Sequence, residues 1–481
     1  MFGSRANPTS HPSNFLSFGP LALALVAVLI PPLSAAPVLQ LGTASIPISP
    51  PPGIGLAGYY HERGSEGTLD DIFAKVIVLD DGQIRAAIVV CDLISMPKWI
   101  VTSARGHIEN RCGIPGSNVL IAATHTHTAP VLLRQSVRDE LDGAAKPVSR
   151  DYSSSLAESI ANAVAQALSN RQPVQVSATV EREDRLAFNR RYRMRDGTVG
   201  WNPGKLNENI VRPAGPTDPE VGVFYAESLS PRRLPILTFV NFAMHPDTTG
   251  GTRISADYPG ALARQLAQHK GPEMLTLFAN GTCGNVNHVN VQWADPQKGP
   301  GETHRIGTVL AASVFKAYAH LEPGIAPLPL RVRSAMVSLP LPAFTEEQLT
   351  QARLDVRTAR DNTRDGFTKL VRAHRVLDTA AQGGKPIDVE VQVIALGSTI
   401  AWVSWPGEIF VELGMSVKAG SPFRHTYNIE LANGAIGYIP NRPAYAEGNY
   451  EVESARVAEG AGELLATTAL RLLRELHSAG R

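Results

Sequence analysis

Cysteine and net charge are both scarce in this chain of 481 residues. Its three cysteines, Cys91, Cys112 and Cys283, allow one disulfide at most and exclude a disulfide framework. They also lie too far apart along the chain to form a zinc knuckle. The 45 lysines and arginines nearly equal the 44 aspartates and glutamates. This balance argues against a protein that binds nucleic acid through a basic surface.

After residue 36 the sequence has no apolar run long enough to span a membrane. The run Leu21–Ile30 has ten apolar residues, whereas a bilayer core of ~30 Å needs roughly 20. Two prolines interrupt it, and the small residues that lead to Ala36 are typical of a cleavage site. We expect residues 1–36 to be a signal peptide and the mature protein to be secreted or periplasmic. An uncleaved membrane anchor is the alternative.

Apolar runs typical of strands alternate with segments of helical periodicity, which predicts a mixed α/β (α+β) fold of layered β-sheets flanked by helices. Strands are expected at 73–79, 84–90, 119–123, 236–242, 274–278, 389–396 and 399–404. Helices are expected at 97–110, 156–168, 257–269, 303–321, 345–378 and 461–477. Residues 192–217, with their Gly, Pro and Asn, predict a mobile surface loop. Asp257 is expected to cap its helix, and four histidines on predicted helices are expected at the surface: His269, His320, His374 and His477.

Three further histidines lie where predicted strands end. His125 and His127 follow the 119–123 strand, and residues two apart in a strand point to the same side. His245 follows the 236–242 strand, beside Pro246. Zinc binds neutral imidazole nitrogen together with carboxylate or phenolate oxygen. The histidines therefore predict a metal site at the strand ends.

Candidate oxygen ligands occur later in the chain. Glu408 ends the tight turn Trp405-Pro-Gly-Glu408, which follows the predicted 389–404 hairpin. Tyr438 and Tyr450 lie in a stretch interrupted by Gly and Pro. A tyrosine in such a stretch is usually a buried aromatic with a hydrogen-bonded hydroxyl, so composition alone selects neither.

Several motifs, taken in order across nearly the whole chain after residue 36, resemble the N-terminal catalytic domain of the neutral/alkaline non-lysosomal ceramidase family. After a Pro- and Gly-rich start they are Ala123-Thr-His125-Thr-His127-Thr, Phe188-Asn-Arg190, Asn241-Phe-Ala-Met-His245-Pro, Ser255-Ala-Asp257-Tyr-Pro-Gly260, Gly281-Thr-Cys-Gly284-Asn-Val286, Pro406-Gly-Glu408, and Gly437-Tyr438 followed by Asn449-Tyr450. A set of motifs in one order is far more specific than any single motif.

The resemblance implies a zinc-dependent amidohydrolase that cleaves an N-acyl amide, ceramide or a related compound, by zinc-activated water. It implies one Zn²⁺ per chain, held by His125, His245, Glu408 and Tyr438. It places three more residues around the substrate amide: His127, Arg190 and Tyr450. Zinc lowers the pKa of bound water from ~15.7 to about 7, His127 is suited to carry a proton, and the other two to donate to the oxyanion. The implied partners are an N-acyl amide or lipid, with peripheral membrane contact for a lipid, and no nucleic acid.

The sequence departs from the family in two places. The family's Gly-Asp-Val-Ser-Pro motif is here Gly284-Asn-Val-Asn-His288, so Asn285 and Asn287 replace the Asp and the Ser. Residues 37–481 are expected to be the catalytic domain, without the family's C-terminal β-sandwich. Both departures weaken the case for ceramide itself. Two alternatives stay open: a non-catalytic, metal-containing binding protein on the same scaffold, and a zinc hydrolase of another ester or amide.

Overall fold

The computed structural model describes residues 12–14, 38–136, 138–324, 327–360 and 363–480. The expected signal peptide, residues 1–36, lies outside the described residues apart from 12–14. The residues from Pro37 onward form one structural unit, to which the following description applies. Within the described ranges, no helix is both long and apolar enough to cross a membrane.

The larger sheet of the described chain has nine strands, in the order β12-β11-β10-β5-β1-β2-β3-β4 with β14 beside β5. Neighbouring strands are antiparallel except for the two outermost pairs, β3–β4 and β11–β12, which are parallel. The strands are β1 Gln40–Pro47, β2 Phe73–Asp80, β3 Arg85–Cys91, β4 Val119–Ala123, β5 Gln172–Arg182, β10 Glu220–Ser228, β11 Pro235–Phe242, β12 Leu275–Asn280 and β14 Glu322–Pro323.

A second sheet has the order β15-β16-β17-β19, and its last pair is also parallel. Its strands are β15 Leu330–Leu339, β16 Ile387–Leu396, β17 Ile400–Ser404 and β19 His425–Ile429. Three small sheets complete the β-structure described. They pair β6 Phe188–Asn189 with β13 Val286–Asn287, β18 Glu408–Ile409 with β20 Tyr438–Ile439, and β7 Arg191–Met194 with β8 Val199–Trp201 and β9 Ile210–Pro213.

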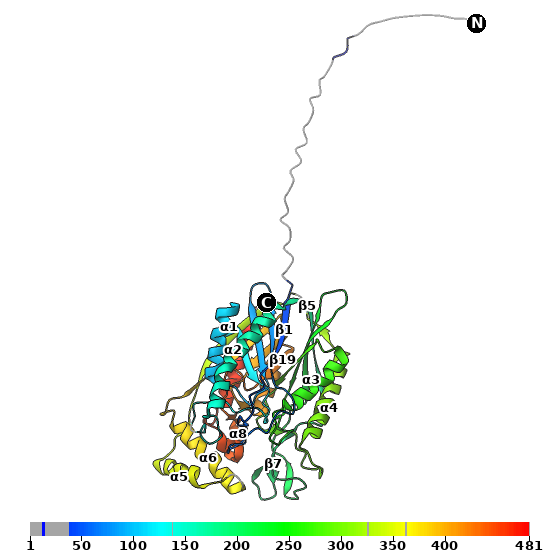
Figure 1. The fold of residues 1–481 in the computed structure, drawn as a ribbon. Coiled ribbons are helices and arrows are strands. Elements are labelled where there is room, and N and C mark those ends of the chain that lie inside the picture. Colours follow the sequence, from blue (N-terminus) through cyan, green and yellow to red (C-terminus); the bar gives the residue numbers. More distant parts are fainter. Residues whose placement is uncertain (1–11, 15–37, 137, 325–326, 361–362, 481) are drawn as a thin grey trace, which may run out of the picture. The chain divides into compact units, whose positions relative to one another are not determined.

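Helices cover the outer faces of both sheets (Figure 1). Helices α1 Lys98–Cys112 and α2 Pro147–Ser169 pack on β1–β4, and α3 Asp257–Lys270 and α4 Pro300–Tyr318 pack on β10–β12. The second sheet is covered by α7 Val411–Gly420 and α10 Ala461–Ser478. The remaining helices are η1 Gly116–Asn118, α5 Glu346–Thr358, α6 Arg364–Ala380, α8 Arg442–Glu447 and α9 Tyr450–Ser454. The predicted mixed α/β fold of layered sheets flanked by helices is thus confirmed.

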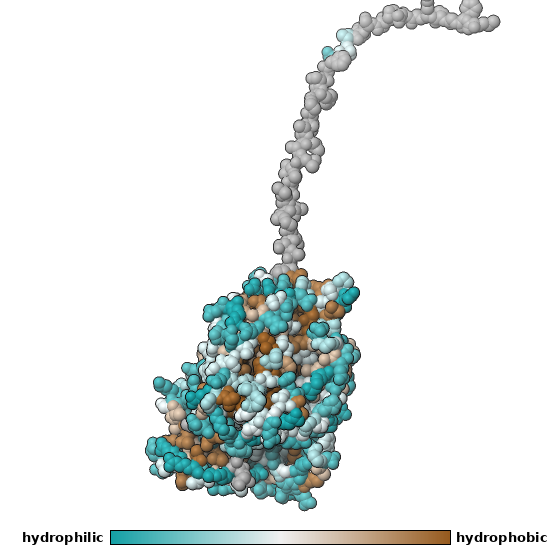
Figure 2. All heavy atoms as spheres, viewed as in Figure 1, coloured by the Kyte–Doolittle hydropathy of each residue, from teal (hydrophilic) through white to brown (hydrophobic). Residues whose placement is uncertain are grey.

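A central apolar core lies between the two sheets. Trp402 of β17 is fully buried there, with its ring edge-on to Phe224 of β10 at 5.1 Å between centroids. On the outside, hydrophilic side chains cover most of the face shown in Figure 2, and apolar ones gather in smaller patches. The burial of both sheet faces explains why most of these strands read as continuous apolar runs.

Several predictions need correction. Residues 192–217 form most of the β7–β8–β9 sheet rather than a loop, because Asp196-Gly197 makes a hairpin turn between short strands. The helix expected at 345–378 is two helices, and Thr363 caps the second by accepting from the amide of Gly366. His374 is buried rather than at the surface. Asp257 is the first residue of α3 rather than its cap, and its carboxylate accepts from the amides of Thr248 and Thr249.

Gly42 of β1 allows α2 to approach closely, which gives a test of this packing. A Cβ on Gly42 would collide with the backbone oxygen of Ala167 in α2. We expect Gly42→Ala to lower the free energy of unfolding by about 1–3 kcal/mol, because the helix must move away from the sheet. Gly106→Ala is the matched control, since this exposed glycine of α1 has open space around it. It should raise stability by about 0.5–1 kcal/mol. Urea denaturation measures both, and equal effects would contradict the packing argument.

Candidate functional site

The ends of strands from both sheets meet at one cluster of titratable side chains. His125 follows β4, His245 follows β11, and Glu408 follows β17. The Glu408 Oε2 atom lies 3.2 Å from the His245 Nε2 atom and 3.4 Å from the His125 Nε2 atom. The imidazole rings of these two histidines have centroids 4.7 Å apart. Residues almost 300 positions apart in the sequence therefore point at a common volume.

Backbone carbonyls fix the orientation of both imidazoles. The Nδ1 atom of His125 lies 2.7 Å from the carbonyl oxygen of Ile94, and that of His245 lies 2.9 Å from the carbonyl oxygen of Cys283. A carbonyl only accepts, so Nδ1 carries the proton and the Nε2 lone pair faces the cluster. His125 also has a positive φ of 76°, which turns the chain sharply where β4 ends. This arrangement is typical of histidines that bind a metal through Nε2.

His127 completes a group of three histidines whose ligand atoms all lie within 4.8 Å of one another and could hold a metal ion. Its Nε2 atom lies 3.4 Å from that of His125. Gly58 packs against the other side of the ring, where a Cβ would approach the His127 Nδ1 atom to 2.7 Å. The structure thus places His127 at the site. From this position it can act either as a metal ligand or as a proton carrier beside the ligands.

The charges of the cluster suit a divalent cation. Burial, together with the charge of Arg190, lowers the pKa of His245 to about 4, and burial lowers that of His127 to about 3. Burial works to raise the pKa of Glu408, but His125 and His245 hold it well below its usual range. Burial likewise lowers the pKa of His125, but Glu408 more than offsets this and raises it. His127 and His245 are thus neutral imidazoles beside an ionised carboxylate, and zinc and similar ions bind these donors.

Tyr438 is placed beside Glu408 by the short parallel pair β18–β20, in which the two residues are direct partners. Burial and the charge of Glu408 raise the pKa of the Tyr438 phenol well above its ordinary value. The Tyr438 ring lies 5.4 Å from that of Tyr450, between centroids. The structure therefore brings together all four residues expected to hold the metal, and the ring of Tyr450 lies beside them.

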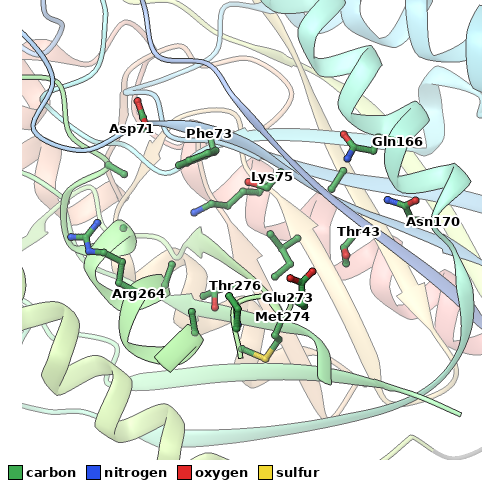
Figure 3. A pocket seen from close by; sticks show the side chains of 18 residues that line it. Thr43, Asp71, Phe73, Lys75, Gln166, Asn170, Arg264, Glu273, Met274 and Thr276 are labelled. Atoms are coloured by element: carbon green, nitrogen blue, oxygen red, sulfur yellow. The ribbon is translucent and has the colours of Figure 1, made fainter. Parts of the chain in front are cut away.

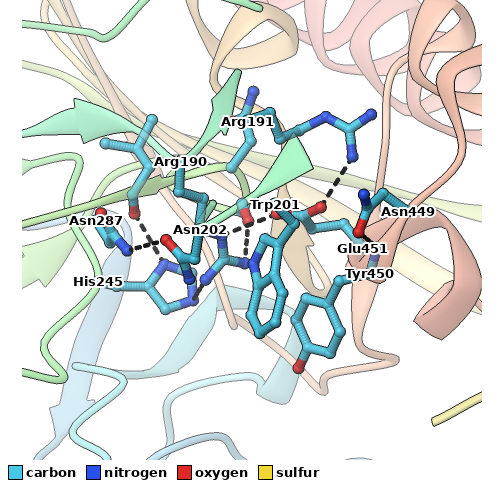
Figure 4. Close-up of polar contacts among 12 residues, drawn as sticks. Arg190, Arg191, Trp201, Asn202, His245, Asn287, Asn449, Tyr450 and Glu451 are labelled. Carbon is cyan, nitrogen blue, oxygen red and sulfur yellow. Dashed lines mark hydrogen bonds and ion pairs between the residues drawn. The ribbon is translucent and has the colours of Figure 1, made fainter. Parts of the chain in front are cut away.

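Arg190 lies beside the cluster in a buried ion-pair network (Figure 4). Its Nε donates to Glu451 at 2.9 Å, one terminal nitrogen donates to the Gly284 carbonyl at 2.6 Å, and the other lies 3.5 Å from the His245 Nε2 atom. The Glu451 carboxylate also forms an ion pair with the Arg191 guanidinium at 2.9 Å. Arg190 is held by these contacts with its guanidinium against the rings of Tyr438 and Tyr450.

A cavity of about 580 Å³ opens beside the cluster and is lined by His127, Arg190, His245, Tyr438 and Tyr450. Its lining includes a group of aromatic residues and a group of polar ones. We call the first group the aromatic wall, Tyr60, Trp201, Phe367 and Tyr450, and the second the polar wall, Asn202, Lys205, Asp247, Asn287, His288 and Lys298. Another hollow, of about 490 Å³, lies between β1, β2 and α3 around Lys75 (Figure 3), and none of the three clustered histidines lines it.

The two asparagines that depart from the family motif have different places. The Asn285 side chain holds the backbone together, since its amide donates to Glu412 at 3.0 Å and its oxygen accepts from the amide of Val411 at 2.9 Å. Asn287 lines the cavity, where its amide nitrogen donates to the Asn202 side-chain oxygen at 3.1 Å. Only Asn287 is therefore positioned to affect a bound molecule.

Sequence reasoning missed several residues of the site: Trp201, Asn202, Phe367, Glu430 and Glu451. Glu430 follows β19 and accepts from the amides of Cys283 and Ile409, at 3.0 and 3.1 Å, so it ties together the loops that carry His245 and Glu408. Burial raises its pKa to about 7. The hairpin signal Asp196-Gly197 could have placed Trp201 on a strand. Nothing local distinguishes the two glutamates from surface carboxylates. All three cysteines are buried and unpaired.

Comparison with known proteins identifies the fold. No family model matches the sequence, and no curated protein matches it. Two solved structures match closely in shape. Neutral ceramidase from Pseudomonas aeruginosa superposes with a TM-score of 0.70 at 18% identity, over 91% of this chain and 75% of that one. A ceramidase complexed with C2 gives 0.70 at 16% identity, over 91% and 76%.

The molecule thus has a mixed α/β fold with a histidine-rich candidate metal site at its strand ends. More particularly, it has the fold of the neutral ceramidases, which confirms the resemblance inferred from the motifs at the level of the fold.

Glu451 offers a test of the network that holds Arg190. It is fully buried and neutralises two buried guanidinium groups. Glu451→Gln leaves those charges without a counter-ion, so we expect it to lower the free energy of unfolding by about 3–5 kcal/mol. The control is Glu447→Gln, because Glu447 is partly exposed and pairs with the half-exposed Arg193 as well as Arg191. Denaturant titration measures the free energy of unfolding of both variants. Equal values for Glu451→Gln and Glu447→Gln would contradict the central role of Glu451.

Proposed function

We propose that this protein is a zinc-dependent amidohydrolase that cleaves an N-acyl amide with water. The observation that carries the proposal is the convergence of the Nε2 atoms of His125 and His245 with the Glu408 carboxylate, beside a cavity lined by His127, Arg190 and Tyr450. The ceramidase fold supports the same reaction class. A structural metal would not need a proton carrier and two hydrogen-bond donors beside an open cavity.

The proposed ligands are His125, His245, Glu408 and Tyr438, which leaves His127 to handle protons. When bound, zinc acidifies a water molecule to a pKa of about 7 and so supplies a nucleophile at neutral pH. The carbonyl contacts at the Nδ1 atoms of both histidine ligands leave their Nε2 lone pairs available. Tyr438 is the partner of Glu408 in the β18–β20 pair and itself lines the cavity.

The remaining residues act on the substrate. His127 is neutral, because burial lowers its pKa to about 3. It is therefore able to accept the proton of the attacking water and pass it to the departing amine nitrogen. Arg190 stays charged and fixed by Glu451, and together with the Tyr450 hydroxyl it donates to the carbonyl oxygen as negative charge develops there.

The cavity favours an N-acyl compound smaller or more polar than ceramide. Asn287 stands where the family has a serine, and it is bulkier and brings both a donor and an acceptor. Its hydrogen bond to Asn202 lines one side of the cavity with amide groups. We further propose that the protein is exported, on the basis of the leader-like residues 1–36, so that the reaction takes place outside the cytoplasm.

Metal content tests the proposed ligands. We expect about one zinc per chain in the purified protein, and His125→Ala and Glu408→Gln should each lose most of it, because each removes a ligand. His127→Ala should keep the zinc but lose turnover. His107→Ala, on the exposed side of α1, should change neither. Elemental analysis measures the content, and a loss in His127→Ala equal to that in His125→Ala would make His127 a ligand instead.

A side-by-side assay of the zinc-loaded protein tests the substrate. We expect a higher kcat/KM on soluble N-acyl amides than on a short-chain fluorescent ceramide, because Asn202 and Asn287 line the cavity with polar amide groups. The highest kcat/KM on ceramide would overturn this preference. An absence of turnover on every compound, with zinc bound, would favour the non-catalytic binding protein.

A further inference from the structure

One cation in the cavity lacks the counter-ion that the others have. Three fixed cations line it: Arg190, Lys205 and Lys298. Arg190 is paired with Glu451 at 2.9 Å, and Lys298 with Asp247 at 3.0 Å. Within the described ranges, no carboxylate lies within the 4.0 Å ion-pair distance of the Lys205 ammonium. Its charge is therefore available to a bound molecule.

The position of Lys205 is fixed by backbone groups. It lies between β8 and β9, and its ammonium donates to the carbonyl oxygens of Ala294 and Asp295 at 2.8 and 2.6 Å. These contacts orient two of its three protons and neutralise none of its charge. Ordering a lysine in advance removes part of the entropic cost of binding an anion.

Asn202 provides a hydrogen-bond donor on the same wall. Its side-chain oxygen accepts from Asn287 at 3.1 Å, and its backbone amide donates to the carbonyl of Arg190 at 2.8 Å. The side-chain amide nitrogen of Asn202 has no acceptor among the residues that the structure describes. An ammonium and an amide donor on one wall match the single charge and two oxygens of a carboxylate.

The aromatic wall is suited to an apolar group. The rings of Trp201 and Phe367 stack with centroids 5.9 Å apart and 7° between their planes, and Tyr450 lies 4.2 Å from Trp201. Tyr60 meets Phe367 edge-on at 5.5 Å. All four rings are only partly buried and line the cavity, so they present a continuous apolar surface beside the candidate metal site.

The two walls correspond to the two ends of the amide. Tyr450 belongs to the aromatic wall and, in the proposed reaction, donates to the acyl carbonyl. Asp247 belongs to the polar wall and directly follows Pro246, whose carbonyl oxygen accepts from the backbone amide of His127 at 3.2 Å. In the proposed reaction, His127 delivers the proton to the departing nitrogen. The acyl group therefore lies on the aromatic side and the amine on the polar side.

Resting on the proposed amidohydrolase function, we propose that the substrates are N-acyl amino acids, whose acyl group packs on the Trp201–Phe367 wall and whose carboxylate binds Lys205 and Asn202. Water supplies the oxygen of the new C–O bond, the amide C–N bond breaks, and the proton from water goes to the amine nitrogen. The products are a carboxylic acid and a free amino acid. No further reactant is needed.

The test compares N-phenylacetylglycine with its neutral carboxamide, N-phenylacetylglycinamide, which has the same shape. We expect the acid to have the lower KM, and raised ionic strength to increase that KM alone, because salt screens the Lys205 charge. Lys205→Met should reduce the acid-to-amide ratio of kcat/KM about ten-fold, mainly through KM, and Lys205→Arg should restore most of it. Arg195→Met is the matched control, because Arg195 follows β7 of the same small sheet and also donates to a backbone carbonyl, that of Glu208, but does not line the cavity.

Calorimetric binding to the catalytically silent His127→Ala variant gives a readout independent of turnover. There the additional Lys205→Met change should raise the Kd of the acid about ten-fold. If Lys205→Met weakens acid and amide equally, Lys205 only holds its loop and the inference is wrong. If the wild type prefers the neutral amide, the substrate class is wrong although the amidohydrolase stands. If the acid binds as expected but neither compound is cleaved, the proposed function fails and the carboxylate site remains.

Discussion

The carboxylate of Glu408 is the group on which the site depends. It lies within 3.4 Å of two imidazole nitrogens in a largely buried place, where an anion is stable only beside positive charge. Glu408 acts in turn on His125, whose pKa it raises against the effect of burial. A divalent cation would supply this positive charge, and the Nε2 lone pairs of His125 and His245 could bind the same ion.

Two further buried carboxylates hold the surroundings of Glu408. Glu430 accepts hydrogen bonds from backbone amides of the loops that carry His245 and Glu408. Glu451 forms ion pairs with Arg190 and Arg191. Buried charges of this kind add little net stability compared with apolar packing, but each is costly to break. Their value here is positional, because they keep Arg190 charged and aimed at the cavity.

The aromatic wall of the cavity comes from several segments, of which helix α6 contributes Phe367. Phe367 of α6 stacks on Trp201, which belongs to the β7–β8–β9 sheet, and on Tyr450 at the start of α9. The polar side comes from other loops, around Asn202, Asn287 and Lys205. The metal site and the two walls thus come from separate segments, so the walls are able to vary while the chemistry is retained.

The sequence by itself determined much of the local structure. The strand at 119–123 was predicted with its observed bounds, and the predicted 389–404 hairpin is the antiparallel pair β16–β17. His125, His127 and His245 could be predicted as a group because each follows a strand, and periodicity and turn residues are local signals. The motifs, taken in order, also indicated the fold that the comparison of structures confirms.

Only the tertiary structure decided which distant residues meet. Arg190 and Glu451 are 261 residues apart, and Glu408 reaches Tyr438 through a pair of strands two residues long. Such contacts cannot be read from the sequence, because one ion pair or one short strand pair does not change the periodicity of apolar residues around it. The same holds for Lys205 and Phe367, whose places in the cavity follow from the packing of whole segments. The sequence therefore contained the reactive groups, whereas the packing of the sheets and loops determined their neighbours, their charges and the shape of the cavity between them.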